Sequence, residues 1–186
     1  MGLSPMSDET LMEAFATGDF VSGEELASRY AGKLCGFFRK SGRDLGRSED
    51  LAQDTLMRMV KSRGDYREGA PFRPWLYTIA HNLLRDEIRK DGRAASRGKD
   101  PVRGTDATQE ASLDLLEARE AKAAIQDAVD LLPENLRTVV VLKHFEGLSS
   151  PEIASVLGIP VGTVWSRMAN ATVRLRQTLV ERGVTP

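Results

Sequence analysis

The last third of the chain carries polar and basic side chains at spacings suited to contacting DNA. They follow and partly overlap the stretch EIASVLGIPVGTVWSRM, Glu152 to Met168. One side of a helix would present them together: Ser166, Arg167, Asn170 and Arg174. Arginine neutralises phosphates, and serine, asparagine and arginine bond to phosphate oxygens or base edges. The pattern therefore indicates reading of DNA by contact, without bond making.

Trp165 is the unexpected member of this stretch. Its indole has one hydrogen-bond donor and no charge, so it cannot make the bidentate guanine contact that arginine makes. It can instead lay an apolar face against a thymine methyl group. The alternative is that Trp165 packs against a neighbouring helix or a partner protein, since large aromatic side chains are often mostly buried.

A second set of side chains, in PWLYTIAHNLLRDEIRK, suits unpaired bases. Helical spacing turns four apolar residues inward: Leu76, Ile79, Ala80 and Leu83. Trp75 begins the helix, and a polar and basic set faces outward: Thr78, Asn82, Arg85 and Arg89. Aromatic rings beside arginines can stack on bases and neutralise phosphates. A buried Trp75 with solvated arginines explains the same pattern equally well.

The stretch SEDLAQDTLMRMV has an apolar side and a polar side. The polar side holds Asp50, Gln53, Asp54 and Met57. An outward methionine among polar residues is typical of an adaptable docking surface. An ordinary solvated face would look much the same.

Side chains suited to catalysis are few. Cys35 lies in the apolar run AGKLCGFF, where a buried thiol is expected, and His81 and His144 are the only histidines. Neither metal-ligand spacing nor a glycine-rich phosphate loop occurs in the sequence. The sequence therefore predicts no enzyme, no metal and no cofactor.

Helices must position these side chains, because apolar residues return every three or four positions and alternation with period two is nearly absent. Ser22 and Glu25 form a capping-box pattern, and Ser48 is a candidate N-cap. Helices are accordingly expected over residues 22–40, 48–62 and 74–90. Helices should resume near Ser112 and break at Pro133, Gly147 and Gly158.

The expected fold class is all-α, with two small helical domains joined by a flexible linker. The domains are 1–93 and 113–186, and the linker, 94–112, is rich in Gly, Ser, Pro and charge. In the second domain a short helix, a turn at Gly158-Ile159-Pro160 and a longer helix predict a helix-turn-helix, whose second helix enters the major groove. An ordinary helical hairpin is the alternative.

Charge is unevenly distributed along the chain. The formal net charge is -1, yet residues 106–134 hold eight acids against two bases, about -6, so the remainder is net positive. One cysteine and the absence of a long apolar run indicate a reducing compartment and no membrane insertion. A cytoplasmic location is therefore expected.

These motifs together resemble a bacterial RNA polymerase sigma factor of the extracytoplasmic-function (group IV) family. The resemblance is carried by SEDLAQDTLMRMV, FRPWLYTIAHNLLRDEIRK and LPENLRTVVVLKHFEGLSSPEIASVLGIPVGTVWSRM, in this order, and covers about Thr10 to Leu179. It implies a transcription initiation factor that binds core RNA polymerase and promoter DNA and is held by an anti-sigma factor. The acidic linker would thread through the polymerase.

The resemblance also implies roles for three sets of residues. The polymerase clamp helices would meet Asp50, Gln53, Asp54 and Met57. The loop from Arg63 to Phe72 would form a pocket for a base flipped from the minus-10 element. The minus-10 set is Arg63, Asp65, Tyr66, Phe72, Trp75, Thr78, Asn82, Arg85 and Arg89. The minus-35 set is Pro160, Gly162, Thr163, Trp165, Ser166, Arg167, Asn170 and Arg174.

The chain departs from the family pattern in the second helix of the helix-turn-helix. Trp165 stands where Lys or Arg is frequent, and Ala169 and Asn170 replace further bases. The family's usual minus-35 preference is therefore not expected. Two other functions are alternatives: a sigma-like decoy that sequesters an anti-sigma factor, and a plain helix-turn-helix repressor, which would leave the first ninety residues unexplained.

Overall fold

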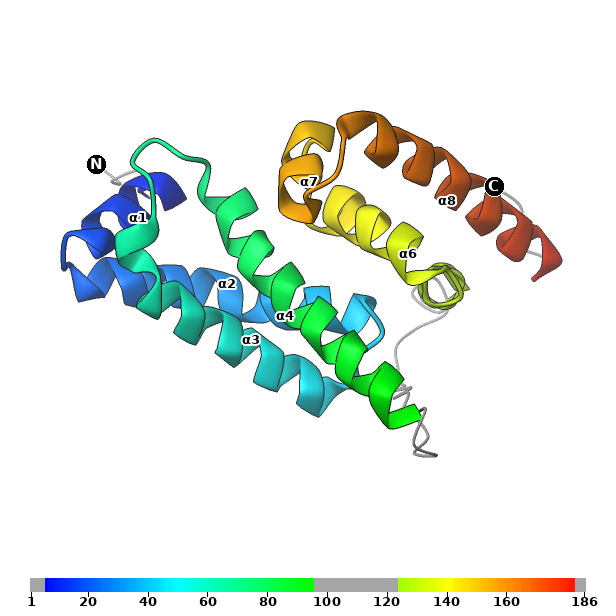
Figure 1. Ribbon diagram of the computed structural model, residues 1–186, viewed down its shortest axis with the longest axis horizontal. Helices are drawn as coiled ribbons and strands as arrows, with labels where there is room; N and C mark the ends of the chain where they lie inside the picture. Colours follow the sequence, from blue (N-terminus) through cyan, green and yellow to red (C-terminus); the bar gives the residue numbers. More distant parts are fainter. Residues whose placement is uncertain (1–5, 96–123, 183–186) are drawn as a thin grey trace, which may run out of the picture.

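The computed structural model describes residues 6–95 and 124–182, and every regular element within them is helical (Figure 1). This confirms the predicted all-α class. In chain order the elements are α1 (Asp8–Ala16), α2 (Phe20–Lys40), α3 (Leu45–Lys61), the 3-10 turn η1 (Arg63–Asp65), α4 (Phe72–Ala95), α6 (Glu134–Val140), the π-helical turn η2 (Val141–Phe145), α7 (Ser150–Leu157) and α8 (Val161–Glu181). Residues 124–130 are also helical. The predicted linker from residue 96 onward, and the helix start near Ser112, lie outside the described residues.

Three helices begin earlier than their sequence patterns indicate, and α4, Phe72–Ala95, also runs past the expected end at residue 90. Aspartate caps account for the early starts of α2 and α3. Asp19 caps α2 by accepting from the Val21 N–H at 3.1 Å, and the Ser22 hydroxyl donates back to Asp19 at 2.6 Å. Asp44 caps α3 through the Arg47 N–H at 2.9 Å. The predicted starts at Ser22 and Ser48 are therefore wrong, because an aspartate just upstream fills the same role and leaves both serines buried inside the first turn.

The N-terminal domain is held together by aromatic side chains shared between α2 and α4. The rings of Tyr30 and Phe72 lie 5.2 Å apart, and those of Phe37 and Tyr77 lie 5.5 Å apart, both edge to face. All four side chains are essentially inaccessible to solvent. Such pairs add about 0.5–1.5 kcal/mol beyond the area that they bury, and here they fix α4 along α2.

The C-terminal domain contains the predicted helix-turn-helix. A reciprocal capping box starts α7: the Glu152 carboxylate accepts from the Ser149 N–H at 2.7 Å, and the Glu152 N–H donates to the Ser149 hydroxyl at 3.4 Å. Gly158 ends α7 with left-handed backbone (φ 63°), which lets the chain turn sharply into α8. Val164 and Ala171 are buried on the inner side of α8. The predicted helix-turn-helix is therefore confirmed.

The two domains pack against each other, which the sequence did not indicate. Helix α4 lies along α7, and α2 contacts η2 (Figure 1). Across this seam the Tyr77 hydroxyl donates to the Glu146 carboxylate, and the Arg137 guanidinium donates to the Ser41 carbonyl at 3.4 Å. Both Tyr77 and Glu146 are buried. The described residues thus adopt a closed arrangement with one continuous apolar core.

Among residues 6–95 and 124–182, no helix combines the length and the apolar character needed to cross a membrane.

Candidate nucleic-acid interface

The first half of α8 presents a polar face beside an exposed indole. Ser166, Asn170 and Arg174 are exposed, and 63% of the Trp165 surface is accessible. Trp165 therefore does not fill the core of this chain. Arg167 is half-buried, at the edge of this face.

The turn before α8 leaves the start of that helix open. Pro160 and Gly162 are exposed, Thr163 is half-buried, and Pro160 offers no side-chain acceptor to the first helical N–H groups. Unpaired N–H groups at a helix start attract phosphate oxygens. The geometry can hold a DNA backbone at the turn while α8 reaches base edges.

Helix α4 presents a mixed polar and basic face. Arg85 and Arg89 are exposed, whereas Thr78 and Asn82 are half-buried. The Thr78 hydroxyl donates to the Pro74 carbonyl at 2.8 Å, which fixes its rotamer. Trp75 is half-buried with its ring 5.3 Å from that of Tyr66. Trp75 is thus neither fully buried nor fully available for stacking on a base: it packs against Tyr66 and remains partly accessible.

The loop between α3 and α4 has a packed underside. Phe72 is fully buried and Tyr66 is 8% exposed, so both rings support the loop from beneath in this conformation. The Tyr66 hydroxyl donates to the Ala70 carbonyl, and burial, with the carboxylates of Glu9 and Glu13 nearby, raises the pKa of Tyr66 to about 12. Asp65 is exposed. The sequence grouped these residues as one DNA-facing set, but the structure divides them into supporting and accessible members.

Arg63 belongs to the supporting part of the loop. Its guanidinium lies 5.7 Å from the ring centres of both Phe15 and Phe20 and donates to the Val60 carbonyl at 2.9 Å. These rings come from α1 and the start of α2. Sequence reasoning missed α1, although Ser7 and the spacing of Leu11, Met12 and Phe15 carry the signal of a capped amphipathic helix.

The outer side of α3 presents the predicted docking set. Asp50, Gln53 and Asp54 are exposed, and Met57 is 55% accessible. An accessible methionine between acidic residues and an amide is typical of an adaptable contact surface.

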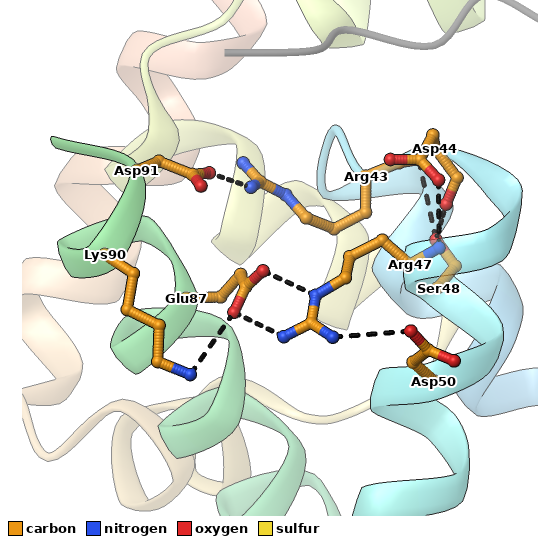
Figure 2. Close-up of polar contacts among 8 residues, drawn as sticks. All are labelled: Arg43, Asp44, Arg47, Ser48, Asp50, Glu87, Lys90 and Asp91. Atoms are coloured by element: carbon orange, nitrogen blue, oxygen red, sulfur yellow. Dashed lines mark hydrogen bonds and ion pairs between the residues drawn. The ribbon is translucent and has the colours of Figure 1, made fainter. Parts of the chain in front are cut away.

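A polar network joins α3 to the second half of α4 (Figure 2). Arg47 makes a two-pronged contact with Glu87, Nε to Oε1 at 2.5 Å and Nη2 to Oε2 at 2.6 Å, and also reaches Asp50 at 3.4 Å. The hydrogen bond from Arg47 lowers the pKa of Glu87, which is 9% exposed. Alongside, Arg43 bonds to Asp91. Residues 40 positions apart thus lock the predicted docking surface of α3 to the basic face of α4. No local sequence pattern predicts such a pair.

The described histidines and cysteine do not gather into a reactive site. His81 is half-buried at the domain seam, where burial, then the charges of Arg85 and Arg167, lowers its pKa to about 4. His144 is exposed and Cys35 is half-buried. Within the described parts of the chain, no group of three or more His, Cys, Asp or Glu side chains is placed to hold a metal ion.

Two family models match the chain in the order of these surfaces. Sigma-70 region 2 matches residues 26–94, which hold the docking set, the loop and α4. Sigma-70 region 4 matches residues 122–175, which hold the helix-turn-helix.

Relatives and solved structures agree with these matches. The ECF RNA polymerase sigma factor SigE of Mycolicibacterium smegmatis is 34% identical, over 97% of this chain and 72% of that protein. CnrH, solved in complex with the cytosolic domain of CnrY, is similar at a TM-score of 0.73 and 27% identity, over 94% of this chain and 97% of that one. The sigma factor RpoE of Bartonella quintana, solved with the anti-sigma factor NepR, is similar at a TM-score of 0.70 and 27% identity, over 84% and 95%.

The order of the two matched regions, the helix-turn-helix and the identity to an ECF factor over nearly the whole chain all support one family. Factors of this family direct RNA polymerase to promoters and leave RNA synthesis to the polymerase. This confirms the resemblance found in the sequence: the chain belongs to the extracytoplasmic-function group of sigma-70 factors and serves promoter-specific transcription initiation.

Proposed function

We propose that this chain binds core RNA polymerase through Asp50, Gln53, Asp54 and Met57, and that its two domains read the two promoter elements. Domain 1–93 would melt and bind the minus-10 element, and domain 113–186 would bind the minus-35 element, with 94–112 between them. The chain performs no chemistry itself and acts in the cytoplasm with the polymerase. The observation that carries the proposal is the Arg47–Glu87 contact, which holds a docking surface and a basic helix face in fixed register.

The minus-10 contacts follow from what α4 and its loop expose. Extruding a base costs a few kcal/mol of stacking and pairing. A loop already packed on Tyr66 and Phe72 loses little entropy when it accepts that base. Trp75, Thr78 and Asn82 lie next along α4, and Arg85 and Arg89 supply phosphate contacts that weaken with salt.

The closed arrangement must open on a promoter. Elements centred at minus 10 and minus 35 are roughly 25 base pairs apart, about 85 Å along B-DNA at about 3.4 Å per base pair. In the closed chain Arg167 of α8 is near enough to His81 of α4 for its charge to lower the pKa of His81. Residues 96–123, about 28 residues, span at most about 90–100 Å when extended. The connection is therefore long enough for the two domains to reach both elements, but they can do so only after they separate at the seam.

An anti-sigma factor is the partner that we propose for the closed chain. RpoE was solved with an anti-sigma factor, and CnrH with the cytosolic domain of CnrY. The high TM-scores extend over both domains, which supports a shared closed arrangement. Such a partner would favour the closed form over the open one.

The docking surface is tested by the double substitution Asp54→Arg with Gln53→Ala. Both side chains are exposed, so the free energy of unfolding should change by about 0.5 kcal/mol or less. Co-purification with core polymerase and promoter-dependent transcription should drop sharply. Glu24→Arg, an exposed acid on α2, is the matched control and should bind as the wild type does. Wild-type polymerase binding by the double variant would contradict the assignment of these residues, whereas a wild-type chain that does not bind core polymerase would favour the decoy.

A further inference from the structure

We propose that α1 sets the base preference at the minus-10 element, because Glu9 and Glu13 hold the backbone of the loop that receives the flipped base. The proposal rests on the proposed function of that loop. Helix α1, Asp8–Ala16, lies outside residues 26–94, the part matched by the sigma-70 region 2 model. Both glutamates act on other residues, so they are positioning residues.

Two carboxylates of α1 accept hydrogen bonds from main-chain groups of the loop. Glu13 Oε1 accepts from the Gly69 N–H at 3.0 Å, and Glu9 Oε1 accepts from the Phe72 N–H at 3.2 Å. Phe72 is the first residue of α4, so Glu9 caps that helix from a different helix. The two contacts are separated by 56 and 63 residues in sequence. They fix the end of the loop and the start of the DNA-facing helix to one rigid element.

Gly69 shows why the loop needs an external anchor. Its φ is 72°, a left-handed conformation that few residues other than glycine adopt readily. Glycine also has the greatest backbone freedom to lose on ordering. The Glu13 carboxylate bonds to this flexible position and selects one of its conformations.

The other end of the loop is anchored on α1 as well. Arg63 stacks over Phe15 of α1 and Phe20 of α2, each at 5.7 Å. Phe15 is buried and is closely backed by Gly23, where an added Cβ would lie 2.6 Å from the Phe15 ring. Helix α1 therefore holds the loop at Arg63, Gly69 and Phe72, with Tyr66 packed between them.

The anchoring leaves the polar side chains at the loop tip free to meet DNA. Asp65, Arg67 and Glu68 are exposed, while Tyr66 between them is buried. Their positions relative to a bound base depend on the backbone that Glu9 and Glu13 hold. A change in α1 should therefore alter which base is preferred, although no α1 side chain touches that base.

The experiment measures base preference at each minus-10 position, using core polymerase with full-length variants on a promoter library that carries a pre-melted bubble. Glu13→Ala and Glu9→Ala should each relax the preference at one or more positions by roughly twofold to tenfold, the worth of one hydrogen bond. Glu13→Gln keeps an oxygen acceptor and should restore most of the wild-type profile. Glu24→Ala removes the same charge from α2 and should leave the profile unchanged.

Asp65→Ala separates failure of this inference from failure of the loop's proposed role. If Asp65→Ala changes the minus-10 profile while Glu13→Ala and Glu9→Ala match the wild type, α1 does not position the loop. A lower melting temperature with an unaltered profile would likewise overturn the proposal, because α1 would then be only structural. If the profile also survives Asp65→Ala, the role of the loop itself is refuted.

Discussion

Trp165 is placed where an uncharged ring can replace a basic side chain. It is 63% exposed on the first turns of α8, next to Ser166 and Arg167. An exposed indole in this position can contact a thymine methyl group or a sugar, but it cannot read guanine as arginine does. The polar contacts are then left to its neighbours.

Trp165→Lys should change the preferred base at one minus-35 position while the free energy of unfolding moves by about 0.5 kcal/mol or less, because the ring packs little against the core. A promoter library transcribed by the two holoenzymes measures the preference. Val180→Lys, another exposed apolar residue on α8, is the control. An unaltered base profile would assign DNA reading to Ser166, Arg167, Asn170 and Arg174 alone.

His81 makes the fold sensitive to acid. Its pKa in the fold is about 4, below the ordinary value of 6.5, so between these values the unfolded chain binds a proton that the fold excludes. Stability should fall as the pH drops from about 6.5 to about 4, by at most about 3 kcal/mol. Burial raises the pKa of Glu146, which acts in the opposite direction.

Urea unfolding of wild type and His81→Gln at several pH values between 7 and 4 isolates the histidine, since Glu146 is present in both proteins. The charged groups near His81 are Arg85 on the same helix and Arg167 on α8. The variant should lose less stability on acidification. Equal slopes for the two proteins would contradict this prediction.

At the scale of elements, α4 combines a packed side and an exposed basic side along one helix. Its inner side buries Leu76, Ala80 and Leu83, and its outer side carries Arg85 and Arg89. The Arg47–Glu87 contact fixes the rotation of this helix against α3. The exposed basic side of α4, for which we propose DNA contact, is therefore held in a fixed orientation.

Asn82→Ala with Arg85→Ala should reduce open-complex formation on duplex promoters. A promoter with a pre-melted bubble should recover much of the loss, because part of the cost of unstacking has been removed. Permanganate footprinting on both templates measures the opening. Arg39→Ala, at an exposed arginine of α2, is the control. An equal defect on both templates would reject a role in melting and leave only base contact.

Local patterns predicted most of the helices and their inner faces but missed α1, and they could not predict long-range contacts. The apolar spacing correctly placed Leu76, Ala80 and Leu83 inside, whereas Ile79, expected inside as well, is only half-buried. Gly158 correctly marked the helix-turn-helix. Helix starts were misplaced where Asp19 and Asp44 compete with a nearby serine as caps. The sequence indicates one surface for the loop because it cannot show that Phe72 packs on Tyr30 of α2 and bonds to Glu9 of α1, both more than thirty residues away in sequence.

At the scale of the whole molecule, the closed seam depends on a few polar contacts inside an apolar interface. Tyr77 donates to Glu146 across the seam, and both are buried. Leaving a buried acceptor without its donor costs about 1–3 kcal/mol. Loss of the Tyr77–Glu146 bond should therefore favour separation of the two domains without disturbing the packing inside either domain.

Tyr77→Phe should shift the chain toward the open form by about 1–3 kcal/mol, roughly 5-fold to 150-fold in the equilibrium. Förster transfer between dyes at Glu24→Cys and Gln177→Cys, in a Cys35→Ser background, measures the separation. Tyr30→Phe is the matched control, because the Tyr30 hydroxyl bonds to Asp8 within the N-terminal domain. Transfer equal to that of the wild type would show that the bond does not hold the domains together.

The covalent connection between α4 and residue 124 turns the seam into an intramolecular association. Joined partners meet at an effective concentration on the order of millimolar, so a contact that separate domains would form only weakly can still keep the joined chain closed. By loop-closure entropy, doubling the length of residues 96–123 would weaken closure by only about 0.6 kcal/mol, roughly a threefold change. Cutting that connection would remove the advantage entirely, and closure would then depend on the concentrations of the two halves.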